Sequence, residues 1–108
     1  MFRKKAFLAI VISTGFIASN ISLAASFDCA MAGTKIEKMI CSNVTTSQLD
    51  EELSKVYKAG IERTQDKKIY QESQSIWLKY NRNSCASTEC LSDAYKERIK
   101  SQIGRAHV

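Results

Sequence analysis

Residues 73–99 read SQSIWLKYNRNSCASTECLSDAYKERI, and this stretch decides the fold. Its first part carries an apolar stripe at helical spacing that includes Ile76, Trp77 and Tyr80. A short polar loop follows between Cys85 and Cys90, and a second helical pattern begins within it, at about residue 88. Short loops between amphipathic helices join antiparallel neighbours, so the stretch predicts two helices packed side by side.

Two further helices are predicted upstream of this pair. Residues 34–37, TKIE, form a capping box, in which the Thr and Glu side chains bond each other's backbone amides. We expect a short helix from there to about residue 41, and a longer one over 47–64 after a connection at 42–46. The downstream helices should cover about 67–82 and 88–103.

The predicted fold is all-α: a small disulfide-stapled helical bundle of one short and three longer helices. Proline is absent and the chain has only four glycines, which favours helix over a turn-rich β fold. Gly60 interrupts the 47–64 helix and predicts either a close helix–helix contact or a kink. Gly104 is the expected C-cap, with residues 26–103 as the folded part and 104–108 as a frayed tail. The helical stripes supply the predicted core: Leu53, Tyr57, Ile76, Trp77, Tyr95 and Ile99.

The first 24 residues have the order of a secretory signal peptide. The positive start FRKK at residues 2–5 precedes an apolar stretch that is too short to span a bilayer of about 30 Å. Small residues then gather before Ala25. We expect removal of residues 1–24, which leaves one domain over 25–108 without a stable membrane anchor. A lipid-modified cysteine is disfavoured, since Asp28 fits poorly just before the cut, and a retained leader is the remaining alternative.

The charge of the chain argues against nucleic-acid binding. The net charge is +5, but the predicted cleavage removes three cations, Arg3, Lys4 and Lys5, and leaves +2. Nucleic-acid binding needs a dense basic face. The only histidine is His107, which has no local base or nucleophile partner, and no glycine-rich phosphate loop is present. We therefore predict a protein that is not an enzyme and has no cofactor.

Four cysteines in a short exported chain indicate disulfides, and four cysteines allow three pairings. Reach favours the local pairs Cys29–Cys41 and Cys85–Cys90, because each pair is separated by a segment that can fold back on itself. A long-range pair such as Cys41–Cys85 would stabilise more and stays open. A metal site or a redox pair is disfavoured, since no Cys-x-x-Cys spacing occurs.

Candidate binding residues lie in two loops and one acidic run. The loops at 42–46 and 83–89 would be presented by a rigid scaffold. The acidic run at 50–52 is either a patch for a basic partner or a charge complement to the start of its helix. The predicted partner-binding residues are Asp50, Glu51, Asn83, Ser84, Ser87 and Glu89.

Four strings carry a family resemblance: SFDCAMAGTKIEKMICSN at 26–43, LDEELSKVYK at 49–58, SQSIWLKYNRNSC at 73–85 and CLSDAYKERI at 90–99. Together they resemble the small bacterial domain named after the lysozyme inhibitor LprI. The residues that carry the resemblance are Phe27, Asp28, Cys29, Glu37, Lys38, Ile40, Cys41, Leu49, Asp50, Glu52, Leu53, Tyr57, Trp77, Leu78, Arg82, Cys85, Cys90, Leu91, Tyr95, Arg98 and Ile99.

The resemblance implies an exported, mainly helical domain with disulfides, in the periplasm or outside the cell. It also implies inhibition of a lysozyme, which we expect to work by steric occlusion of the muramidase cleft. The alternative is a non-inhibitory envelope protein with another partner. The expected partner is therefore a lysozyme or another envelope protein, and not a nucleic acid.

Overall fold

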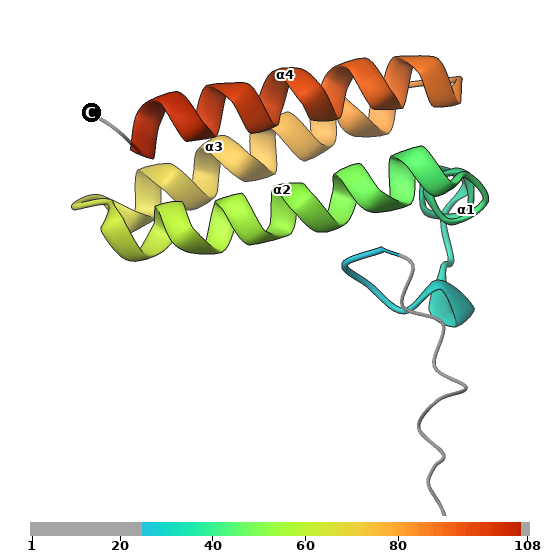
Figure 1. The fold of residues 1–108 in the computed structure, drawn as a ribbon, viewed down its shortest axis with the longest axis horizontal. Coiled ribbons are helices and arrows are strands. Elements are labelled where there is room, and N and C mark those ends of the chain that lie inside the picture. Colours follow the sequence, from blue (N-terminus) through green and yellow to red (C-terminus); the bar gives the residue numbers. More distant parts are fainter. Residues whose placement is uncertain (1–24, 107–108) are drawn as a thin grey trace, which may run out of the picture.

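Three long helices and one short helix dominate the computed structural model, which describes residues 25–106 (Figure 1). The predicted all-α bundle is confirmed. The predicted signal peptide, residues 1–24, and residues 107–108 lie outside the described residues. The elements in chain order are the 3-10 turn η3 (Cys29–Met31), α1 (Lys35–Cys41), α2 (Val44–Arg63), α3 (Lys67–Tyr80), the 3-10 turn η4 (Arg82–Ser84) and α4 (Thr88–Ala106).

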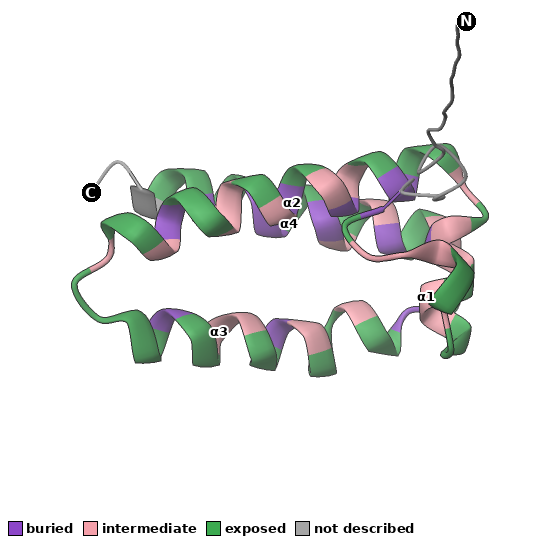
Figure 2. Ribbon diagram, turned by 90° about the horizontal axis from the view of Figure 1, so that it is seen from below, coloured by how far each residue is buried: buried purple, intermediate pink, exposed green. Residues whose placement is uncertain are grey.

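Helices α2 and α4 lie side by side and make the most extensive contact in the bundle (Figure 1). The buried residues of α3 face this pair of helices, and its exposed residues face away from it (Figure 2). Helix α1 packs across one end of α2. The N-terminal strap, residues 25–34, lies beside that end. The core is therefore built mainly between α2 and α4, and α3 covers one side of it.

Local hydrogen bonds explain the bounds of α1, which match the prediction. The amide of Glu37 donates to the Thr34 hydroxyl (3.0 Å), and the Glu37 carboxylate accepts from the amides of Gly33 (2.9 Å) and Thr34 (3.2 Å). This is the predicted capping box. The two backbone amides, with Gly33 as the largest cause, lower the pKa of Glu37.

Helix α2 begins at Val44, earlier than predicted. Asn43 is its N-cap and accepts from the amide of Thr46 (3.0 Å). The hydroxyls of Thr46 and Ser47 are buried and donate to the carbonyl of Ile40 (2.9 and 2.7 Å). The polar residues that suggest a loop thus form the first helical turn and attach it to the end of α1.

Helix α4 continues past its predicted end. The prediction that Gly104 is a C-cap is wrong, because α4 runs through it to Ala106 and no described glycine has a positive φ. Residues 104–106 therefore belong to the helix and not to a tail. At the other end of α4, the Ser87 hydroxyl accepts from the amide of Cys90 (3.1 Å), as a cap residue should.

The core centres on Tyr95, which is fully buried and packs its ring against Trp77 with 5.4 Å between centroids. Tyr57 is only partly buried and packs against Tyr70, with 5.3 Å between the ring centroids. The predicted core residues that the structure buries are Leu53, Trp77, Tyr95 and Ile99.

The prediction that Ile76 is a core residue is wrong, because its side chain is exposed. Successive residues of a helix are about 100° apart, so neighbours such as Ile76 and Trp77 point in different directions. The side of α3 that carries Tyr70 and Trp77 is buried, and Ile76 lies beside that buried strip.

Both predicted disulfides are present, Cys29–Cys41 with 5.8 Å between Cα atoms and Cys85–Cys90 with 5.5 Å. No cysteine is free. The first ties the strap to the end of α1, and the second closes the connection between α3 and α4. Each closes a local loop, so the three long helices are held together by packing and hydrogen bonds.

At Gly60, α2 comes into close contact with the Tyr70 side chain of α3. A Cβ atom placed on Gly60 would lie 2.6 Å from Cζ of the buried Tyr70, and closer still to its hydroxyl. Real Cβ atoms do not approach other atoms so closely. Of the two predictions for Gly60, the close helix–helix contact is the one observed.

We expect Gly60→Ala to lower the free energy of unfolding by about 1–3 kcal/mol, because the Tyr70 ring must move to make room. The matched control is Gly104→Ala in α4, which has no atom within 4 Å and should raise that free energy by up to about 1 kcal/mol. Urea unfolding of both variants measures the difference. Equal stabilisation by the two substitutions would contradict the close contact.

Candidate functional site

The predicted partner-binding residues fall into two groups. Asp50 is only 6% exposed, so the prediction that it meets a partner is wrong. The alternative prediction, a charge complement at the helix start, is also wrong, because the first turn of α2 holds no acidic residue. Glu51 is partly buried on the same helix. Four exposed residues gather around the Cys85–Cys90 loop at one end of the bundle: Asn83, Ser84, Ser87 and Glu89.

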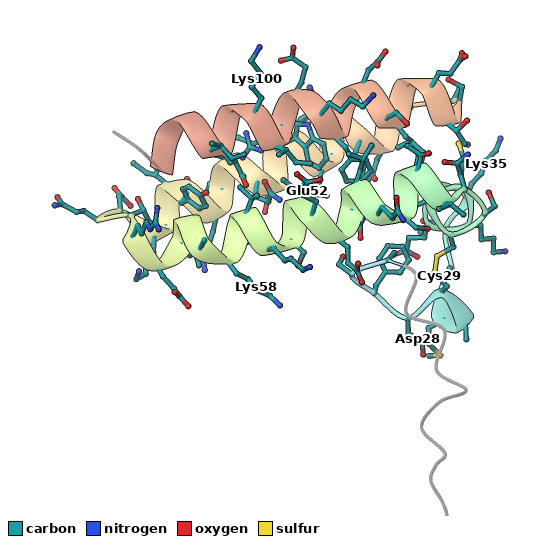
Figure 3. All side chains as sticks on the ribbon, viewed as in Figure 1. Asp28, Cys29, Lys35, Glu52, Lys58 and Lys100 are labelled. Atoms are coloured by element: carbon teal, nitrogen blue, oxygen red, sulfur yellow. A yellow bond between two sulfur atoms is a disulfide. The ribbon has the colours of Figure 1, made fainter. Side chains whose placement is uncertain are left out.

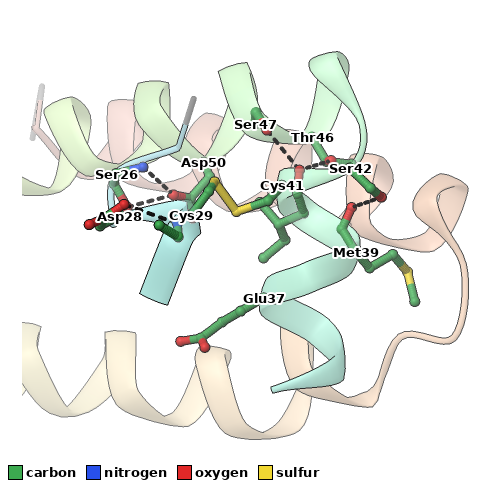
Figure 4. Close-up of a disulfide and its surroundings, with 12 residues drawn as sticks. Ser26, Asp28, Cys29, Glu37, Met39, Cys41, Ser42, Thr46, Ser47 and Asp50 are labelled. Carbon is green, nitrogen blue, oxygen red and sulfur yellow. Dashed lines mark hydrogen bonds between the residues drawn. A yellow bond between two sulfur atoms is a disulfide. The ribbon is translucent and has the colours of Figure 1, made fainter. Parts of the chain in front are cut away.

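Asp50 is a buried acceptor that joins three segments. Its Oδ1 accepts from the hydroxyl of Tyr95 on α4 (2.6 Å), and its Oδ2 accepts from the Ser26 amide of the strap (2.8 Å). The Ser26 hydroxyl donates to the same Oδ2, and Figure 4 shows this pair beside the Cys29–Cys41 disulfide. A buried carboxylate needs such donors, since an unpaired charge in the interior is very costly. Asp50 therefore has a structural role.

The environment of Tyr95 follows from this arrangement. Burial raises the pKa of Tyr95, and its hydrogen bond to the Asp50 carboxylate raises the pKa further. Arg82 acts in the opposite direction but is outweighed. The Tyr95 hydroxyl therefore stays protonated as a hydrogen-bond donor across the physiological pH range.

A second polar cluster joins α3 to α4. The guanidinium of Arg98 donates through Nε to Gln74 Oε1 and through Nη2 to the Ser73 hydroxyl, both at 3.0 Å. The amide of the fully buried Gln102 lies 2.7 Å from the same Gln74 oxygen. Hydrogen bonds thus supply part of the contact between α3 and α4. For this reason α3 can stay packed on the bundle without burying its whole apolar stripe.

A groove of about 730 Å³ lies between α3 and α4 and starts at the Cys85–Cys90 disulfide. A hollow of about 380 Å³ extends it along α3 and shares Trp77, Asn81 and Arg98 with it. We call the two together the α3–α4 groove. The residues that line it include the apolar or aromatic Ile69, Ile76 and Tyr80 from α3 and Asp93, Ala94 and Glu97 from α4.

Residues 25–106 contain neither a candidate metal site nor a candidate membrane-spanning helix. No group of three His, Cys, Asp or Glu side chains there is arranged to hold a metal ion. No helix in that part of the chain has the length and apolar character needed to cross a membrane.

A protein-family model described as "Lysozyme inhibitor LprI" matches residues 28–101. The match covers more than half of the chain and contains all four cysteines, Asp50 and Tyr95. No curated protein matches the chain, and no solved structure matches it.

We expect Asp50→Ala to lower the free energy of unfolding by about 3 kcal/mol, because the Tyr95 hydroxyl and the Ser26 amide lose their acceptor. The matched control is Glu52→Ala, an exposed carboxylate on the same helix, which should change that free energy by less than about 0.5 kcal/mol. Denaturant unfolding of the oxidised protein measures both. Similar losses in the two variants would show that Asp50 is not a structural acceptor.

We also expect stability to fall as the pH rises above about 10. The pKa of Tyr95 is raised by folding, so above the ordinary tyrosine value of 10.0 the folded protein keeps a proton that the unfolded chain releases. This contribution is complete below that pH and is lost as the pH climbs toward the folded pKa. Unfolding free energies measured from about pH 8 to 11 should decline less in Tyr95→Phe than in the wild type, whereas identical slopes would refute the raised pKa.

Proposed function

This chain belongs to the lysozyme inhibitor LprI family, and on that premise we propose that it is an exported protein that binds a lysozyme-type muramidase and blocks its substrate cleft. The family match over residues 28–101 is the observation that carries the proposal. Two disulfides support an oxidising compartment, such as the periplasm or the cell exterior. The signal-peptide pattern at residues 1–24 supports export.

The proposed mechanism is steric occlusion, with no chemical step by this protein. Residues 83–89 suit it, because η4 and the Cys85–Cys90 disulfide hold this connection in one shape. The Ser84 hydroxyl donates to the carbonyls of Tyr80 (3.0 Å) and Asn81 (2.9 Å), which fixes the turn after α3. A pre-organised loop loses little conformational entropy on binding. Its exposed polar groups are therefore well suited to enter a glycan-binding cleft.

The other predicted loop, residues 42–46, is a weaker candidate. Val44, Thr45 and Thr46 belong to α2, and the Thr46 hydroxyl is buried against the Ile40 carbonyl. Only Ser42 and Asn43 remain outside the helices, and the Asn43 side chain caps α2.

A second candidate function is that of an envelope protein that binds a partner other than a muramidase. The exposed apolar side of α3 favours it, because such a surface suits protein binding whatever the partner is.

We expect the processed, oxidised protein to slow lysis of bacterial cells by a c-type or g-type lysozyme at micromolar concentration, measured as turbidity. Replacing Asn83 and Glu89 together by Ala, with the α4 cap Ser87 left intact, should weaken inhibition roughly tenfold through lost contacts, about 1.4 kcal/mol of binding free energy. The control is Lys58→Ala on α2, whose side chain points away from the bundle (Figure 3). No slowing of lysis by the wild type at micromolar excess would remove the proposed function.

A further inference from the structure

Helix α3 carries a strip of solvent-exposed apolar side chains. Ile69, Ile76 and Tyr80 are 61%, 59% and 64% exposed. They are seven and four residues apart, so they lie along one side of the helix. Single exposed apolar side chains are ordinary, but three along one side of a helix in a small domain suit a binding surface. The strip is the half of the apolar stripe of α3 that the bundle leaves uncovered.

The strip borders the α3–α4 groove along its length. Tyr80 lies in the larger part, opposite acidic residues of α4, whereas Ile69 and Ile76 line the adjoining hollow, where Arg98 is the residue from α4.

Asp93 and Glu97 line the larger part of the groove from α4, one helical turn apart, and both are exposed. Within the described residues, neither carboxylate has a hydrogen-bond or ion-pair partner. Glu72 lines the hollow farther along α3. Three carboxylates and one guanidinium, Arg98, line the groove, so its net charge is −2 (−3 + 1) beside the exposed apolar side chains.

The cations at the groove offset only part of this negative charge. The guanidinium of Arg98 lines both parts of the groove and donates to Gln74 and Ser73. Both partners are neutral, so Arg98 keeps its positive charge and offsets one of the carboxylates. The Lys79 ammonium lies 5.3 Å from the centre of the Tyr80 ring. Such a contact between a cation and an aromatic face is favourable, so the ring of Tyr80 suits a cationic neighbour.

We propose that the α3–α4 groove binds a cationic, partly apolar segment of the partner protein. An apolar side chain of the partner packs on Ile76 and Tyr80, and flanking Lys or Arg side chains face Asp93 and Glu97. This inference rests on the proposed function for the identity of the partner, a lysozyme-type muramidase. A second copy of this chain is a poorer occupant, since two grooves seated face to face would oppose their carboxylates.

The groove also continues the loop surface proposed for occlusion. Ser84, Cys85 and Cys90 line its near end, where the Cys85–Cys90 loop begins. A partner that receives the loop in its cleft would therefore meet the groove with the rim of that cleft. Loop and groove together form one binding surface along the end and one side of the bundle.

The test is a titration of the full chain, exported, processed and labelled with ¹⁵N, followed by amide chemical shifts. The two probes are a c-type lysozyme and a synthetic amphipathic peptide of Leu and Lys. We expect both probes to move the signals of Ile69, Ile76, Tyr80 and Glu97, and neither to move that of Glu62 on α2.

Charge variants test the acidic residues of α4 separately. Asp93→Asn combined with Glu97→Gln should weaken binding of both probes roughly tenfold and reduce its dependence on salt. The matched control removes two exposed carboxylates from α2, Glu52→Gln with Glu62→Gln, and should leave both affinities unchanged.

The outcomes separate this inference from the proposed function. Lysozyme binding with shifts confined to other surfaces overturns the groove and leaves the proposed function standing. Groove shifts with the peptide, without any binding of lysozyme, support the groove and remove the proposed function. No response of the groove to either probe, or groove shifts that arise from self-association alone, overturns the inference.

Discussion

The buried carboxylate of Asp50 is the constraint on which the rest of the structure depends. It sits on α2 and takes its donors from α4 and from the strap, so three segments must be in place at once. A charged group in the interior is tolerated only when it is fully hydrogen-bonded. The disulfides cannot replace this contact, because both close local loops. The hydrogen bonds of Asp50 and the packing of Tyr95 against Trp77 therefore hold the helices and the strap together as one domain.

Helix α3 contacts the bundle through only one of its sides. Tyr70 of α3 packs against Gly60 of α2, and Trp77 of α3 packs on Tyr95 of α4. Arg98 of α4 adds hydrogen bonds to α3. These contacts use only one strip of the helix, and the neighbouring apolar strip stays exposed. A small domain can forgo that burial because other contacts hold α3 in place. The exposed strip, the acidic residues of α4 and the closed loop then form a surface suited to binding.

Local rules predicted much of the fold, and contacts distant in sequence explain what they missed. The capping box set the start of α1, and the reach of the chain gave both disulfides. Periodicity identified the stripe on α3 but not which half of it faces the bundle, so Ile76 was misplaced. The role of Asp50 could not be read locally, since its donors lie 24 and 45 residues away. The exposed loop residues were predictable from their place between two helices, but the groove depends on how α3 is rotated against α4.

Hydrogen exchange at the Ser26 amide tests the central claim most directly. This amide lies in the strap, outside any helix, and its acceptor is the Asp50 carboxylate. In the oxidised protein, its exchange should be slowed to a rate comparable with amides in the middle of α2, and Asp50→Asn should speed it markedly. Exchange of the Ser26 amide at the rate of a free peptide in the wild type would contradict the account.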